Sequence, residues 1–104
     1  MHIVIFITCA NKKEAGRIGT ALVKNKLAAC VNIVDKVESI FWWQANIDRA
    51  REELLIIKSQ KSKLTKIIKL VKSIHSYQVP EIIALPIIAG NKEYLKWINE
   101  SLTF

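Results

Sequence analysis

The order of apolar and polar positions divides the chain into short strands and amphipathic helices. An unbroken apolar run, Ile3 to Ile7, predicts a buried strand over residues 2–10. The next segment has helical spacing and extends to about Asn25, with Asn11 as its capping residue and Glu14 three positions further on. Its inner face is expected to carry Ala15, Ile18, Ala21 and Leu22.

Residues 28–43 read as one extended segment of unusual length. Because strands are most often about 5–6 residues long, a bulge or bend is expected near Asp35 and Lys36. Residues 44–46 predict a turn, in which Asn46 rather than Ala45 is expected to take the positive φ, since Asn tolerates it better. The return strand is predicted over residues 47–59.

The second half of the chain predicts a helix, a strand and a final helix. Residues 61–74 carry an apolar stripe opposite a row of lysines, which is typical of an amphipathic helix. Residues 81–89 predict the fourth strand, Gly90 a break, and residues 92–102 a last helix. In that helix Leu95, Ile98 and Leu102 are expected to point inward.

The element order β-α-β-β-α-β, followed by a terminal helix, predicts a single α+β domain over residues 1–104. Right-handed crossovers fold this order into a ferredoxin-like antiparallel sheet with both main helices on one face. The apolar strands then leave the other face bare, and copies of the same chain are the simplest cover. The long hairpin of strands two and three would overhang the sheet, exposing Phe41, Trp42 and Trp43.

Charge and cysteine content narrow the function classes. The net charge of +7 allows nucleic acid or an acidic partner, but most lysines of residues 61–74 read as a solvated helix face. The first strand lacks the basic and aromatic residues of an RNA-binding sheet, which makes nucleic-acid binding an unfavoured alternative. Cys9 and Cys30 show no metal-finger spacing, and Cys30 is expected to be a small core residue. With no signal peptide or membrane-length segment, a cytoplasmic protein with no membrane partner is expected.

The corner formed by residues 75–82 is the best candidate for chemistry. His75 ends a basic helix, Pro80 pins the turn, and Glu81 opens an apolar strand. Imidazole suits Cu(II) and Zn(II), so His75 is a candidate metal ligand with Glu81 and Tyr77 as neighbours. The alternative is a structural histidine at a helix end, and Glu81 could equally accept a structural hydrogen bond. We find no catalytic triad, phosphate loop or paired carboxylates, so an enzyme is not expected.

Four motifs resemble the CutA family of small divalent-cation-tolerance proteins. They are residues 26–33 (Lys-Leu-Ala-Ala-Cys-Val-Asn-Ile), 39–43 (Ser-Ile-Phe-Trp-Trp), 53–59 (Glu-Leu-Leu-Ile-Ile-Lys-Ser) and 75–82 (His-Ser-Tyr-Gln-Val-Pro-Glu-Ile). The likeness covers essentially the whole chain in the right order. Ser76 stands where the family usually has Pro, Gln78 where it often has Glu, and Ala45 where its hairpin turn commonly has Gly.

The resemblance implies a ferredoxin-like fold and a tightly associated homotrimer, shaped like the nitrogen-regulatory PII trimers, with a link to copper and other divalent cations. In some relatives a cysteine near the end of the first strand is linked to copper, and the matching position here is Thr8. Since side chains alternate along a strand, the thiol of Cys9 should turn away from a site built for its neighbour, which makes Cys9 a poor candidate ligand. The expected self-interface comprises Phe41, Trp42, Trp43, Tyr77 and Trp97.

Two hypotheses follow for function. The first is a homotrimeric binding protein for tolerance of divalent metal ions, with His75 as a ligand of copper or a similar cation bound weakly. The second is a PII-like signalling or scaffold trimer, whose inter-subunit clefts bind a small effector or a protein.

Overall fold

The computed structural model describes residues 1–103 and has the predicted element order. The strands are β1 (His2–Cys9), β2 (Cys30–Trp43), β3 (Asn46–Gln60) and β4 (Ile82–Pro86). The helices are α1 (Lys12–Lys24), α2 (Leu64–Ile74), which follows a 3-10 turn at Lys61–Lys63, and α3 (Lys92–Ser101). The α+β, ferredoxin-like prediction is confirmed.

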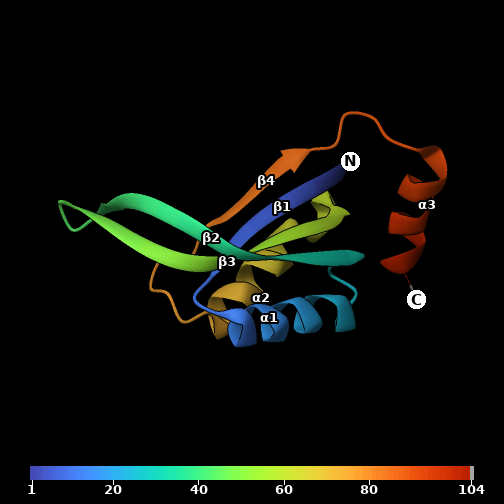
Figure 1. Cartoon of the computed structure of the whole chain (residues 1–104). Coiled ribbons are helices and arrows are strands. Elements are labelled where there is room, and N and C mark those ends of the chain that lie inside the picture. Colours follow the sequence, from blue (N-terminus) through green and yellow to red (C-terminus); the bar gives the residue numbers. More distant parts are fainter. Residues whose placement is uncertain (104) are drawn as a thin grey trace.

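The four strands form one antiparallel sheet in the order β2-β3-β1-β4. Both α1 and α2 lie against the same face of this sheet, and α3 lies at the end opposite the hairpin (Figure 1). The core fills the space between sheet and helices, and its fully buried side chains include Ile5, Ile7, Ile18, Leu22, Leu55, Ile57, Ile67 and Val71. Alternation along β1 therefore turns the odd-numbered side chains toward the helices.

The opposite face of the sheet is apolar and largely open. Alternation places Phe6 and its neighbour Ile83 of β4 on this face, together with Leu85 and Val34. Ile83 and Leu85 are 50% and 42% exposed, which is unusual for large aliphatic side chains at the middle of a strand. Cys30 also lies here, half-buried beside Lys58 and Asn32, so the expectation of a core cysteine was wrong. Cys30 pairs with Lys58 of β3, and the even-numbered side chains of β3 point away from the helices.

The hairpin of β2 and β3 extends as a long arm beyond the rest of the sheet (Figure 1). Its pairing shifts register between Val34 and Val37, which confirms the bulge expected near Asp35 and Lys36. Lys36 takes a φ of 60° there, a left-handed conformation that a bulge commonly imposes. The molecule reaches 44 Å along its longest axis.

The tip of the arm differs from the sequence prediction. Trp43 pairs with Asn46, so the loop contains only Gln44 and Ala45. Both have positive φ, 50° and 66°, because a two-residue loop of this kind requires left-handed geometry at each position. Asn46 belongs to β3, and its side-chain Nδ2 donates to the carbonyl oxygen of Gln44 at 3.2 Å.

The fourth strand is shorter than predicted. It pairs with β1 from Ile82 to Pro86, and Glu81 lies just before it. The reason is the length of its partner: beyond the pair Ile3–Pro86, β1 offers only His2, whose carbonyl accepts one further bond from the Ile87 N–H at 3.0 Å.

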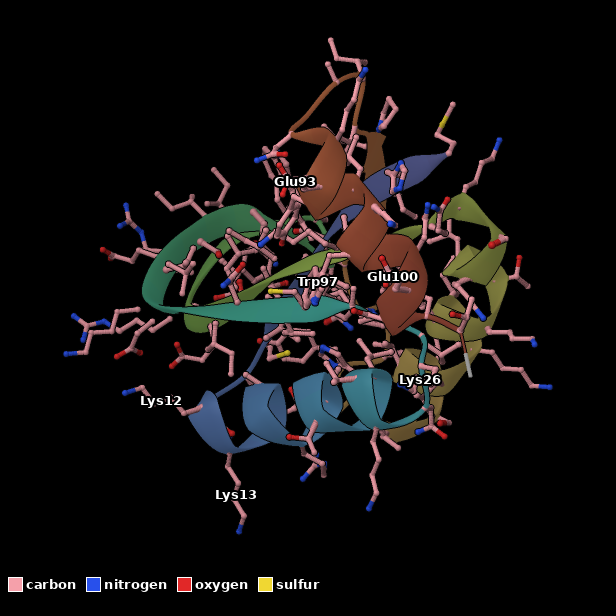
Figure 2. The ribbon with its side chains drawn as sticks, turned by 90° about the vertical axis from the view of Figure 1, so that its right-hand side faces the viewer. Lys12, Lys13, Lys26, Glu93, Trp97 and Glu100 are labelled. Carbon is pink, nitrogen blue, oxygen red and sulfur yellow. The ribbon has the colours of Figure 1, made fainter. Side chains whose placement is uncertain are left out.

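The last helix is attached through polar side chains as well as the buried Ile98 and Leu102. The His2 imidazole Nε2 lies 3.1 Å from the Leu95 carbonyl oxygen and 3.0 Å from the Asn99 side-chain oxygen. Figure 2 shows α3 from outside, with Lys13 of α1 extending into solvent beyond the helix layer. No helix within residues 1–103 is long and apolar enough to cross a membrane.

Candidate functional site

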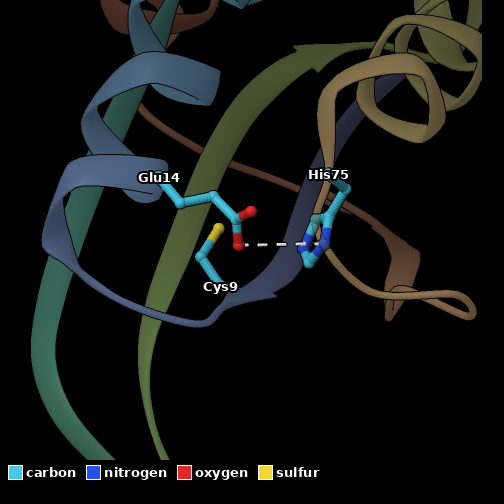
Figure 3. Close-up of side chains that lie close together, drawn as sticks. All are labelled: Cys9, Glu14 and His75. Atoms are coloured by element: carbon cyan, nitrogen blue, oxygen red, sulfur yellow. Dashed lines mark ion pairs between the residues drawn. The ribbon is translucent and has the colours of Figure 1, made fainter.

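Three segments far apart in sequence meet at one buried corner. Cys9 ends β1, Glu14 lies in the first turn of α1, and His75 follows α2. Their ligand-type atoms, a thiol sulfur, a carboxylate oxygen and an imidazole nitrogen, all lie within 4.8 Å of one another (Figure 3). The side chains of His75 and Glu14 are 0% and 4% exposed, so the group is enclosed by protein.

Glu14 connects this corner to two backbone segments. The Asn11 side chain accepts from the Glu14 N–H at 2.8 Å, which caps α1 as predicted. The Glu14 carboxylate then accepts from the N–H of Ala10 at 3.0 Å and from the N–H of Ser76 at 2.8 Å. Burial acts to raise the pKa of this carboxyl, but the hydrogen bonds from Ala10 and Ser76 outweigh it and leave the pKa lowered.

His75 is hydrogen-bonded through its backbone and both ring nitrogens. Its N–H donates to the Val71 carbonyl at 2.9 Å and closes α2. Nδ1 accepts from the Tyr77 N–H at 3.0 Å, and Nε2 lies 2.8 Å from the Thr8 carbonyl oxygen. These partners specify a neutral imidazole with its hydrogen on Nε2, because Nδ1 must accept while Nε2 donates. Nδ1 also lies 3.8 Å from the Glu14 carboxylate.

Cys9 is fully buried in the core, on the helix side of the sheet. Thr8 points to the other face of the sheet and lines a cleft described below, so adjacent side chains of β1 lie in different surroundings. Cys9 nevertheless lies beside His75, which strand alternation alone did not predict. Burial, followed by the charges of Glu14, Glu52 and Glu53, raises the pKa of the thiol to about 12.

The donor set suits a borderline metal ion by type. Imidazole, thiolate and carboxylate together are ligands of Zn(II) and copper ions. The three donors are, however, already engaged or protonated. An ion would have to take Nδ1 from the Tyr77 N–H and displace the Cys9 proton, while Glu14 keeps lone pairs to share.

A separate cleft lies between the arm and the segment that follows His75. It has a volume of about 720 Å³ and is lined by side chains of both strands of the arm and by residues 77–79 and 81. At its inner end the Tyr77 hydroxyl donates to the buried Glu52 carboxylate at 2.8 Å. Glu81 is exposed in this cleft and is not part of the Cys9–Glu14–His75 group.

Four of the five residues expected at a self-interface are exposed, and the five do not all lie on one surface. The exposed fractions are 38% for Phe41, 72% for Trp42, 41% for Trp43 and 43% for Trp97, whereas Tyr77 is half-buried. Phe41, Trp42, Trp43 and Tyr77 line the cleft, but Trp97 belongs to α3, where its ring centroid lies 5.4 Å from that of Tyr94.

Glu14 and Glu52 are the site residues that the sequence did not identify. The helix-capping pattern at Asn11 and Glu14 was visible, but the contact with Ser76 requires α1 to lie beside the end of α2. Glu52 lies within β3, where nothing in the local pattern distinguishes it from other charged strand residues.

Comparison with known proteins identifies the family. The model of the family described as CutA1 divalent ion tolerance protein matches residues 3–101. This chain belongs to the CutA1 family. A CutA1 structure from Thermus thermophilus superposes with a TM-score of 0.95 at 44% identity, covering 97% of this chain and 98% of that one. The CutA structure from Archaeoglobus fulgidus is described as that of a periplasmic divalent cation tolerance protein. It superposes with a TM-score of 0.96 at 44% identity, covering 99% of this chain and 100% of that one.

A plant relative adds a difference in length. The rice protein CutA 1, chloroplastic (Oryza sativa subsp. japonica), is 46% identical over 95% of this chain, but the match covers 56% of the rice protein. The chain therefore spans about half the length of the plant relatives that it matches, and most of the length of the Thermus and Archaeoglobus CutA proteins.

Proposed function

We propose that this CutA1-family chain is a homotrimeric, non-enzymatic binding protein that responds to divalent metal ions and holds copper or a similar cation weakly. The observation that carries the proposal is the convergence of Cys9, Glu14 and His75 within 4.8 Å. His75 is the central ligand, since imidazole is the commonest protein ligand of such metal ions. Family membership supplies the class of ligand, and the donor types agree with it.

The same geometry supports weak rather than tight binding. Binding of a cation at this corner breaks the hydrogen bond from the Tyr77 N–H to Nδ1 of His75. It also requires the Cys9 thiol, whose pKa is raised, to release its proton. Both costs reduce the net affinity, and the second one makes affinity rise with pH. Of the expected ligands, Glu81 faces the cleft, so a carboxylate at the corner comes from Glu14 instead.

Self-association is supported by the surfaces that a single copy leaves open. These are the apolar outer face of the sheet and the aromatic arm, where Trp42 is 72% exposed. Large exposed apolar surfaces of this kind mark contacts with a partner, and identical chains usually form closed rings or dimers. A trimer is the state that the family resemblance implies. We propose a cytoplasmic location for this chain, although named relatives include a chloroplastic and a periplasmic protein.

A titration with Cu(II) tests the metal proposal. Wild type, His75→Ala and the control His2→Ala are titrated, and absolute mass by light scattering and bound metal are measured on the same peak. We expect His75→Ala to weaken binding at least tenfold and His2→Ala to leave it unchanged. Equal affinity in all three proteins would remove His75 from the metal site, and a folded monomer at micromolar concentration would refute the trimer.

The cleft favours a second candidate function, a PII-like trimer whose clefts bind a small effector or a protein. The volume of the cleft beside the arm, about 720 Å³, is within the size range of small-ligand sites. Tight binding of a metabolite in metal-free buffer would place this function ahead of metal binding. Binding through the +7 charge to nucleic acid would instead weaken steeply with salt and show no sequence preference.

A further inference from the structure

The basic residues of the chain gather along its two main helices. Residues 12–26 and 61–74 contain ten of the 16 lysines and arginines but one of the nine acidic residues, so they contribute +9 and the rest of the chain −2 to the net charge of +7. Eight of these ten basic residues are exposed, and the other two are half-buried. We call this surface the helix face, and its basic residues are Lys12, Lys13, Arg17, Lys24, Lys26, Lys61, Lys63, Lys66, Lys69 and Lys72.

The protein neutralises little of this charge. Glu14 is the acidic residue of these two segments, but it is buried and its carboxylate accepts from two backbone N–H groups. Within residues 1–103, ion pairs reach two of the ten basic residues: Lys12 lies 3.0 Å from Asp35, and Arg17 lies 3.8 Å from Glu14. The other eight form no ion pair with any residue of that range.

The start of α2 has the same excess of positive charge. Its first turn contains no acidic residue and no side-chain cap, and the 3-10 turn before it contains Lys61 and Lys63. Negative charge is normally favoured at this end of a helix, because the backbone N–H groups there form the positive end of the helix dipole. Lys66, Lys69 and Lys72 follow at intervals of three residues, where like charges on a helix repel. A bound polyanion would relieve this repulsion, whereas a metal cation would add to it.

The helix face stays exposed when copies of the chain associate as proposed above. Both α1 and α2 lie against one face of the sheet (Figure 1), whereas the contacts between copies are assigned to the opposite face and to the arm. Each copy in the assembly therefore presents its own helix face to solvent. Binding at this face uses neither the Cys9–Glu14–His75 group nor the cleft, so it is independent of both functions proposed above.

The helix face offers charge and few other contacts. Residues 12–26 and 61–74 contain no Phe, Tyr or Trp, and Val23 is their one exposed large apolar side chain. Single-stranded nucleic acid stacks its bases on aromatic rings, membrane-surface helices insert large apolar side chains, and the hot spots of protein interfaces are enriched in aromatic residues. The helix face therefore suits a partner that presents charge alone.

The type of basic residue narrows the partner further. Nine of the ten are lysines, whose ammonium groups act as point charges toward phosphate, whereas arginine favours pairs of fixed two-pronged geometry. A flexible chain can bring its charges to lysines on two neighbouring helices, to which a rigid duplex cannot adjust. An acidic peptide is less suited, because each of its Glu side chains loses rotamer freedom when it is held. We propose that the helix face binds linear inorganic polyphosphate, a flexible chain with negative charge on every phosphate and no apolar group.

Titration of the assembled protein with four probes tests the inference. Long-chain polyphosphate, orthophosphate, duplex DNA and poly-L-glutamate are added at equal phosphate or carboxylate concentration in metal-free buffer, with calorimetry as the readout and mass by light scattering in each sample. We expect polyphosphate to bind most tightly and orthophosphate not to bind, since a single phosphate reaches too few lysines. The affinity for polyphosphate is expected to fall about a hundredfold between about 50 and about 200 mM salt, as about five neutralised charges on a single strand imply.

Two matched double variants locate the site. Lys66→Gln with Lys69→Gln removes two charges from the helix face, and Lys92→Gln with Lys96→Gln removes two from the exposed side of α3. Both variants lower the net charge by two, and glutamine is a good helix former, so they differ in where the charge is lost. We expect the first variant to weaken polyphosphate binding about tenfold and to reduce the slope of log affinity against log salt by about 0.7 for each lysine. The second variant should leave both unchanged.

Three results would overturn the inference. They are equal losses in the two double variants, which would reduce the effect to net charge, no polyphosphate binding by the folded assembly, and duplex DNA or polyglutamate binding as tightly as polyphosphate. The last result would assign the helix face to a different polyanion. Both double variants are expected to bind Cu(II) as wild type does, so a failure here is distinguishable from a failure of the metal proposal.

Discussion

The Glu14 carboxylate accepts a hydrogen bond from the backbone N–H of Ser76 at 2.8 Å, which joins the start of α1 to the end of α2. The same carboxylate accepts from the N–H of Ala10 at 3.0 Å. One side chain thus satisfies two backbone donors in a region where water has little access, and it fixes the segment that leads to Tyr77 and the cleft.

Glu14→Gln is expected to lower the free energy of unfolding by about 1.5–3 kcal/mol at pH 7, because the amide group cannot accept from both N–H donors as a carboxylate does. Urea unfolding monitored by tryptophan fluorescence measures the change. The control is Glu93→Gln, an exposed first-turn glutamate of α3. Equal losses in the two variants would contradict the role given to the buried carboxylate.

The lowered pKa of Glu14 also predicts a dependence of stability on acid. A carboxyl group with a folded-state pKa below its unfolded value stabilises the protein above the unfolded value, about 4.3, and this stabilisation is lost as pH falls through the folded pKa. Wild type should therefore lose stability more steeply below about pH 4.3 than Glu14→Gln does. Parallel pH profiles of the melting temperature would show that Glu14 does not contribute.

Cys9 is expected to be unreactive toward thiol reagents in the folded protein. With a pKa of about 12, only about one Cys9 thiol in ten thousand is ionised at pH 8. In a Cys30→Ala background, a disulfide reagent should label Cys9 only after denaturation, whereas Cys30 in a Cys9→Ala background should react in the folded state. Because the folded pKa is raised, stability falls as pH rises above the ordinary thiol value. Rapid labelling of native Cys9 would refute its burial.

Tyr77→Phe removes the hydroxyl donor from the buried Glu52 carboxylate and is expected to cost about 1–3 kcal/mol of unfolding free energy. The burial of Tyr77 and the hydrogen bond to Glu52 both raise the pKa of the phenol, so its spectrum should show no ionisation until well above pH 10. Tyr94→Phe, on the exposed side of α3, is the matched control and should change stability little.

Ala45→Gly is expected to stabilise the arm by about 0.5–1 kcal/mol, because Ala45 has a φ of 66° and a left-handed conformation costs a residue with a Cβ more than it costs glycine. Thermal unfolding measures the gain. Ala50→Gly, within the strand β3, should destabilise instead, since glycine weakens a strand interior. A loss of stability in both variants would show that the tip is not strained.

The sequence predicted the elements whose signals are local, and missed the features that depend on packing. The amphipathic stripe of residues 61–74 and the capping pair Asn11 and Glu14 were sufficient to place both main helices. The prediction for the tip of the arm was wrong, because the length of the loop depends on the pairing of Trp43 with Asn46, which no single strand specifies. The contact of Cys9 with His75 depends on where α2 ends relative to β1, so strand alternation alone could not predict it.

The bulge between Val34 and Val37 bears on how ligand preference can diverge among relatives. A bulge bends the strand that contains it, and the cleft lies between this arm, with its aromatic side chains, and the segment around Val79. A substitution at Lys36, whose left-handed backbone forms part of the bulge, can widen or narrow the opening while every lining side chain is retained. Two homologues with identical lining residues can then select ligands of different girth, so ligand specificity should be inferred from the backbone of the bulge as well as from the residues at the walls.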